Sequence, residues 1–163
     1  MRTSVAAFAL FRRATPAGRV EYLAQWNEAW HAFHFVGGHK RDDESFRDCC
    51  VREVAEELGL VEGRDFRLAP ERRCHLRYIH WSESARADTA YTVELFDAEL
   101  LCPAVASVEA DPNNRWLIES DIRGGRCRNG RAVSPTMLRI LSLAGLTADK
   151  SDSAFRVPPE SLP

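Results

Sequence analysis

The chain has 163 residues, a length that suits a single domain with a core of useful size. Its formal net charge of −2 predicts no broad electrostatic attraction to nucleic acid or to a membrane surface. No apolar run approaches the ~20 residues that a transmembrane helix needs, and the five cysteines form no C-x-x-C pair. We therefore expect a cytoplasmic protein with reduced thiols.

Three short strands are expected before residue 37. Their apolar and β-branched residues, with a turn at Ala14–Gly18 between the first two, predict an antiparallel start of a sheet. The expected strands are Val5–Phe11, Val20–Trp26 and Ala32–Val36. The third strand leads into Gly37 and Gly38, where glycine permits a positive φ or a close approach of the backbone to a ligand.

A helix is expected directly after this glycine pair. Ser45 suits the N-cap position and Asp48, three residues on, completes a box-like cap. Gly59 suits the C′ position that ends a helix. An apolar stripe with a spacing of four residues would pack one edge of this helix into a core. The stripe consists of Phe46, Cys50, Val54 and Leu58.

The second half of the chain is expected to return to strands and then to a helix. Arg72–Trp81, Ala90–Leu101 and Arg115–Ile118 read as strands, with polar Ser82–Asp88 joining the first two. Pro103–Asn114 is expected to be a long loop and Glu119–Arg123 a turn. Ser134 followed by Pro135 predicts a helix start, and the helix would run to about Ala144 and end at Gly145.

Residues 1–146 are expected to form one domain. The segment from Thr147 to Pro163 is polar and proline-rich, and we expect a loosely held tail. The order strands, helix, strands, helix indicates a mixed α/β fold, although this order alone does not determine the topology.

Three carboxylates share one face of the first expected helix. Glu53, Glu56 and Glu57 have the spacing that places them within an arc of about 100°. Like charges at this spacing repel one another, and a divalent cation would turn the repulsion into attraction. Carboxylate oxygens favour hard cations such as Mg²⁺ or Mn²⁺.

The segment around these glutamates resembles the Nudix box, G-x5-E-x7-R-E-U-x-E-E-x-G-U, where U is aliphatic. Every defined position is filled without a gap, by Gly38, Glu44, Arg52, Glu53, Val54, Glu56, Glu57, Gly59 and Leu60. Nine specified positions at fixed spacing are a far more specific signal than a lone glycine motif. An amphipathic surface helix would explain the helix but not the glycine pair, Glu44 or Arg52.

The resemblance implies an α/β/α sandwich with a mixed β-sheet and the box helix beside it. It implies a Mg²⁺-dependent hydrolase, with Mn²⁺ as a substitute, that cleaves the pyrophosphate bond of a nucleoside diphosphate linked to another moiety. By position, the metal ligands would be Glu53, Glu56, Glu57 and the Gly38 carbonyl. Glu56 or Glu57 would also help to activate the attacking water, and Arg52 would orient a glutamate with Glu44 as its loop partner.

Residues outside the box are weaker candidates. Members of this family often add an acidic residue from a loop, and Glu109 is our candidate, with an ordinary surface glutamate as the equal alternative. Lys40 and Arg77 could meet phosphates and Trp81 could stack on a base. For each, a solvated charge or a packing contact is the plainer interpretation.

Other classes of protein remain open at this stage. The chain could be an inactive Nudix-like domain that binds a nucleotide and regulates, or an interaction protein with an acidic helix. A zinc site at Cys74, His75 and His80 is disfavoured because the spacing matches no common zinc pattern. Proteins resembling this one are often dimers, so a homodimer is also open. The sequence indicates neither the particular nucleotide substrate nor the general base.

Overall fold

The computed structural model describes residues 2–82 and 85–147, and the tail expected at Thr147–Pro163 lies outside them except for Thr147. Seven strands form one sheet in the order β4-β6-β1-β3-β2-β7, with β5 also paired to β6. Strand β1 is parallel to β6 and antiparallel to β3, so the sheet is mixed. The strands are β1 (Arg2–Ala14), β2 (Val20–Asn27), β3 (Ala32–His39), β4 (Phe66–Leu68), β5 (Cys74–Ser82), β6 (Ala87–Leu100) and β7 (Asn114–Ile118).

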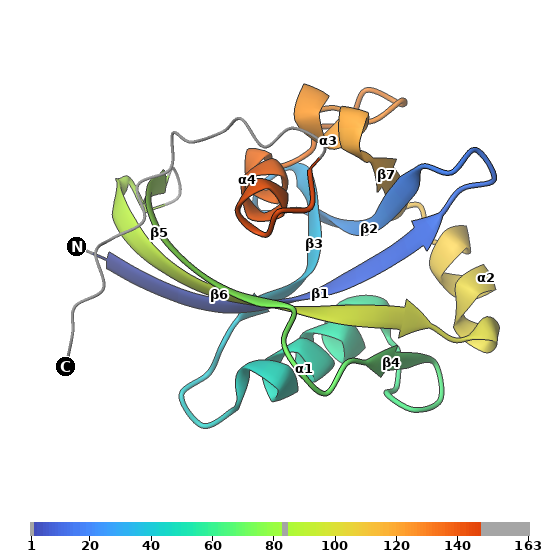
Figure 1. Ribbon diagram of the computed structural model, residues 1–163, viewed down its shortest axis with the longest axis horizontal. Coiled ribbons are helices and arrows are strands. Elements are labelled where there is room, and N and C mark those ends of the chain that lie inside the picture. Colours follow the sequence, from blue (N-terminus) through green and yellow to red (C-terminus); the bar gives the residue numbers. More distant parts are fainter. Residues whose placement is uncertain (1, 83–84, 148–163) are drawn as a thin grey trace.

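Helices cover both faces of this sheet, as Figure 1 shows. Helix α1 (Phe46–Leu58) and helix α2 (Cys102–Ala110) pack on one face, and helix α3 (Glu119–Gly124) and helix α4 (Pro135–Leu143) on the other. The arrangement is an α/β/α sandwich, which confirms the expected fold class. Among the described residues, no helix is long and apolar enough to cross a bilayer.

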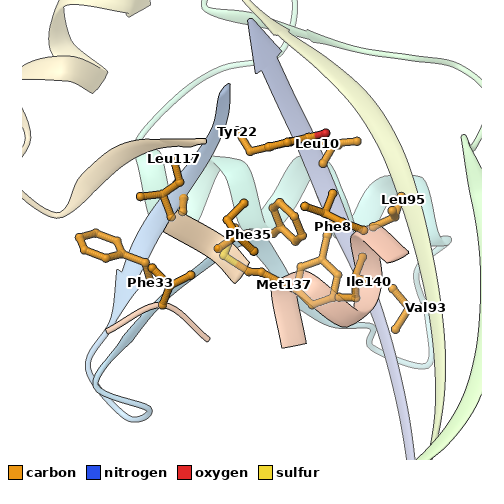
Figure 2. Packing of buried hydrophobic residues seen from close by; sticks show 14 of the residues in the cluster. Phe8, Leu10, Tyr22, Phe33, Phe35, Val93, Leu95, Leu117, Met137 and Ile140 are labelled. Atoms are coloured by element: carbon orange, nitrogen blue, oxygen red, sulfur yellow. The ribbon is translucent and has the colours of Figure 1, made fainter. Parts of the chain in front are cut away.

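The larger of two buried clusters lies between the sheet and helix α4 (Figure 2). Met137, Ile140 and Leu141 are three and four residues apart, so they share the face of α4 that points at the sheet. Phe8 of β1 and Phe35 of β3 meet them from the sheet. The three α4 side chains are completely buried and hold the helix against the sheet. Truncation of such a residue lowers the free energy of unfolding by about 2–5 kcal/mol.

The smaller cluster joins helix α1 to the opposite face. Cys50 and Val54 of α1 are fully buried against Ala7, Ala9 and Val36 of the sheet. The small alanines let the helix approach closely. This contact holds the helix that carries the box glutamates at a fixed height above β1 and β3.

The ends of α1 agree with the sequence. The Ser45 hydroxyl accepts from the Asp48 N–H at 3.0 Å, while the Asp48 carboxylate accepts from the Ser45 N–H at 3.4 Å. Gly59 has a left-handed φ of 69° and its N–H donates to the carbonyl of Ala55. Both predicted caps are confirmed.

The prediction of a long loop over Pro103–Asn114 is wrong. Helix α2 begins at Cys102 and continues to Ala110. Pro103 lies in the first turn, where its missing N–H removes no helical hydrogen bond. Ala104 and Val108, four residues apart, are both buried against the sheet, so an apolar stripe with helical spacing outweighs the signal of the proline.

Two short elements were also missed. The turn predicted at Glu119–Arg123 is a single helical turn, α3, whose first N–H groups are capped by Asp121 through a bond from the Ile118 N–H at 3.3 Å. Strand β4, only three residues long, pairs with the end of β6 and was not predicted. Both are shorter than the windows over which periodicity can be recognised.

Candidate active site

Two consecutive glycines at the end of β3 each accommodate one glutamate of α1. The Gly37 N–H donates to Glu57 Oε2 at 2.9 Å. At Gly38, a Cβ atom would lie 2.7 Å from Glu53 Oε1, closer than real Cβ atoms approach such an atom. The glycine pair therefore fixes one carboxylate by a hydrogen bond and leaves room for the other.

Gly37 also meets the neighbouring strand. Its φ of 142° lies outside the range that side chains favour, and a Cβ there would stand 2.2 Å from the carbonyl oxygen of Ala7. Only glycine fits this position, because the obstructing atom belongs to the backbone of β1. The close approach that the sequence indicated for the glycine pair is thus made to β1 by Gly37 and to Glu53 by Gly38.

Arg52 is the hub of the ion pairs around the box. Its Nε and Nη2 atoms donate to the two carboxylate oxygens of Glu44, at 2.9 and 2.7 Å. Its Nη1 atom donates to Glu53 at 2.7 Å and to Glu56 at 3.0 Å. The fork to Glu44 is the loop partnership that the sequence led us to expect, and it holds the pKa of Glu44 at about 2.

Glu57 is partly buried and lies in the last turn of α1. Burial, together with the negative charges of Glu53 and Glu56, raises its pKa to about 7, although the hydrogen bond from the Gly37 N–H acts in the opposite direction. Without a cation nearby, this carboxyl therefore holds a proton near neutral pH far more readily than an exposed glutamate.

The residues at this site fit a hard divalent cation. Glu53 and Glu56 already share one cationic group, Arg52 Nη1, and a second arginine, Arg41, reaches Glu56 at 3.3 Å. All available donors are carboxylate or carbonyl oxygens, the ligands that Mg²⁺ and Mn²⁺ prefer. Within residues 2–82 and 85–147, however, no three acidic, histidine or cysteine side chains converge as a preformed metal cluster.

Glu109 lies on helix α2 and is bound elsewhere. Its Oε1 atom accepts from Arg13 Nη1 at 2.5 Å, and Arg13 also donates to Glu21 at 2.8 Å. The Arg13 guanidinium lies 4.2 Å from the ring centroid of Trp116. No hydrogen bond or ion pair among the described residues joins Glu109 to a box glutamate, so the structure does not bring this candidate into contact with the others.

Two of the three candidate substrate contacts, Arg77 and Trp81, lie on the same side of the sheet as the box, judged by strand register. Gly38 pairs with Ala7 of β1, and Ala7 pairs with Glu94 of β6. Glu94 pairs in turn with β5, so the side chains at these register positions share one face of the sheet. Alternation along β5 puts Arg77 and Trp81 on that face, and the Trp81 side chain is 46% exposed. Lys40 is nearer, and its Nζ atom donates to the carbonyl of Arg41 at 2.9 Å.

One positioning contact was not visible in the sequence. The Gln25 side chain of β2 donates to the carbonyl of Glu57 at 2.6 Å and so ties the last turn of α1 to the sheet. The two residues are 32 positions apart, and no local pattern marks such a pair. The structure also pairs Arg41 with Glu56, a second contact that no local pattern marks.

The family model described as the NUDIX domain matches residues 2–116 of this chain, which is well over half of its length. No significant match was found among curated proteins. The fold and the glycine–glutamate arrangement thus define a Nudix domain.

Solved structures show the same fold at low sequence identity. The Ap4A hydrolase of C. elegans is 21% identical with a TM-score of 0.54, over 73% of this chain and 83% of that one. The Nudix hydrolase RenU of M. smegmatis is 18% identical with a TM-score of 0.52, over 85% of each chain. The NUDIX domain of Shewanella oneidensis NrtR, crystallised with ADP ribose, is 15% identical with a TM-score of 0.55, over 89% and 88%. This chain belongs to the Nudix family, whose hydrolases generally use divalent metal ions.

Proposed function

We propose that this protein is a Mg²⁺-dependent hydrolase that cleaves the pyrophosphate bond of a nucleoside diphosphate linked to another moiety. The observation that carries the proposal is the docking of Glu57 and Glu53 on consecutive glycines. A helix with a merely solvated acidic face would not need its glutamates held against a neighbouring strand. Such fixed carboxylates are what a metal site requires of its ligands.

In this proposal the ligands are the carboxylates of Glu53, Glu56 and Glu57 and the carbonyl oxygen of Gly38. When bound, the metal would lower the pKa of a water and neutralise charge on the phosphoryl oxygens. Arg52 acts through the glutamates, because its guanidinium fixes Glu53 and Glu56 while Glu44 anchors the other side of the fork.

In this proposal Glu56 or Glu57 would help to activate the attacking water. In the metal-free protein the raised pKa of Glu57 lets it hold a proton near neutral pH, and metal binding would displace that proton. Glu56 is the more exposed alternative, with its side chain 51% accessible. A part for Glu109 remains a prediction, and it requires that its carboxylate first leave Arg13.

In this proposal the substrate would meet the face of the sheet that carries α1. Lys40 and Arg77 would meet phosphates, and Trp81 would stack on a flat ring. The exposed indole and the shared face with Gly38 support this placement. A nucleotide-type ligand is also present in the related NUDIX domain of NrtR, which was crystallised with ADP ribose.

A cytoplasmic location belongs to the same proposal. The structure describes all five cysteines and pairs none of them, and Cys102 is exposed as a free thiol. Free exposed thiols suit a reducing compartment. Association into a homodimer is proposed from family resemblance alone.

The test is a panel of nucleoside triphosphates, dinucleoside polyphosphates, nucleotide sugars, ADP-ribose, NADH and coenzyme A, each with Mg²⁺ or Mn²⁺. Product release is expected from at least one compound and only with metal. Glu56→Gln and Glu57→Gln should each lower turnover by about 100-fold or more while the protein stays folded.

The matched control is Glu99→Gln, because Glu99 is an exposed glutamate of β6 with no described ion pair. It should keep wild-type turnover. Full activity in both box variants would refute the assigned site. Measurable nucleotide binding with no turnover on any compound would instead favour the regulatory domain that the sequence left open.

A further inference from the structure

A cavity of about 560 Å³ lies at the end of the sheet remote from the box. Its floor is made by Arg12, Val20 and Tyr22, and its walls by residues 118–120 and 145–147. Arg12 and Tyr22 are register partners on β1 and β2. A smaller hollow of about 270 Å³ continues on the other side of Arg12 and Val20.

This cavity is separate from the candidate active site. Gly38 pairs with Ala7 of β1, and Arg12 is five residues further along, about 17 Å at the usual strand rise. Ala7 packs in the cluster beneath α1, whereas Tyr22 packs in the cluster beneath α4. The two sites therefore lie on opposite faces of the sheet as well as at different positions along β1.

Positive charge exceeds negative charge around the cavity. The single carboxylate of Asp97 is shared by Arg12, at 3.0 Å, and Arg73, at 2.8 Å. Glu119 in the wall is paired with Arg123 at 2.7 Å. Arg19 lines the cavity too, and its side chain has no ion pair among the described residues. Among the residues that line the cavity, the two guanidiniums of Arg12 and Arg19 thus face one carboxylate, that of Glu119.

The remaining lining suits a flat apolar body. Val20 is 44% exposed, and Ile118 and Leu146 add further apolar surface to the lining. The phenol of Tyr22 donates to the carbonyl of Leu146 at 3.4 Å, which closes one side. Ser120 contributes a hydroxyl. A volume of this size falls within the range of small-molecule sites.

We propose that this cavity binds a phosphate monoester of mononucleotide size, with the phosphate between Arg12 and Arg19 and a flat ring over Val20. Surplus guanidinium charge matches a dianionic phosphate, since arginine binds phosphate through paired N–H donors. Because the cavity is remote from the box, such a ligand would act as an effector rather than as the hydrolysed substrate. The proposal does not depend on the proposed hydrolysis.

The test is calorimetric titration of the full chain with AMP in metal-free buffer, which removes metal-assisted binding at the box. Arg19→Gln should raise the Kd for AMP at least about tenfold, the effect of losing one charge-assisted contact. Arg67→Gln, an exposed arginine of β4 with no described ion pair, is the matched control and should leave the Kd unchanged. Adenosine and inorganic phosphate should each bind more weakly than AMP.

Amide chemical shifts locate the ligand independently of the variants. Shifts of Ser120 and Leu146 on addition of AMP are expected, with little change at Gly37 and Glu57. Three results would overturn the proposal: no binding at millimolar AMP, equal Kd values in wild type and Arg19→Gln, or shifts confined to the box.

Discussion

The substitution Gly38→Ala separates metal binding from folding. The new Cβ would lie 2.7 Å from Glu53 Oε1 and 2.8 Å from its Cδ, so the Glu53 carboxylate must move by several tenths of an ångström. Its bond from Arg52, now 2.7 Å, would be weakened, at a cost of about 1–2 kcal/mol. Part of this loss is offset, since Gly→Ala restricts the unfolded chain by about 0.4–1 kcal/mol. We expect the free energy of unfolding to fall by only about 1 kcal/mol.

The expected effect of Gly38→Ala on the site is much larger. A displaced ligand should weaken Mn²⁺ binding at least about tenfold and lower turnover about 100-fold, as small misplacements of reacting groups do. Electron paramagnetic resonance of free Mn²⁺ measures metal binding, and unfolding in urea measures stability. Unchanged Mn²⁺ affinity and turnover in Gly38→Ala would refute the reasoning.

The comparison variant is Gly37→Ala. Its Cβ would stand 2.2 Å from the backbone oxygen of Ala7, at a φ of 142° that alanine rarely adopts. We expect a loss of about 3 kcal/mol or more in the free energy of unfolding, because neither strand can yield as a side chain can. Equal stability of the two alanine variants would contradict the assignment of separate tasks to the two glycines.

Three further predictions concern charged and titratable groups. The folded-state pKa of Glu57 is about 7, against an ordinary value of 4.5, so the metal-free protein should lose up to about 3 kcal/mol of stability as the pH rises from 4.5 to 7. Urea unfolding measures this loss, and Glu57→Gln should abolish it. Arg52→Lys should lower stability by about 2 kcal/mol in the same assay, since lysine cannot form the fork to Glu44, and an unchanged midpoint would contradict this. Burial lowers the pKa of His34 to about 4, so the stability of the protein should fall by about 3 kcal/mol as the pH falls from 6.5 to 4. The thermal midpoint of the wild type should fall with it over this pH range, and the midpoint of His34→Phe should lack this fall.

Local patterns in the sequence predicted the parts of the fold that local physics determines. The caps of α1 depend on Ser45, Asp48 and Gly59, which act within one helical turn of the helix ends, and they are as expected. The spacing of Glu53, Glu56 and Glu57 likewise needs only the helical period. These features could be predicted because each depends on residues close in sequence.

The features that local patterns did not reveal depend on contacts between distant residues. Arg13 and Glu109 are 96 positions apart, and their ion pair turns a candidate catalytic carboxylate into a bound one. Gln25 reaches the end of α1 across 32 positions. Helix α2 was missed because Pro103–Asn114 was expected to be a loop, and only the burial of its apolar stripe against the sheet decides in favour of a helix.

The central claim is that the glutamates docked on the glycine pair hold a divalent metal. Titration of the protein with Mn²⁺, comparing the wild type with a Glu53→Gln/Glu57→Gln double variant, tests it most directly, because it needs no knowledge of the substrate. The account predicts saturable binding in the wild type and a Kd at least about 100-fold higher in the double variant. Equal Mn²⁺ affinity in two folded proteins would contradict it.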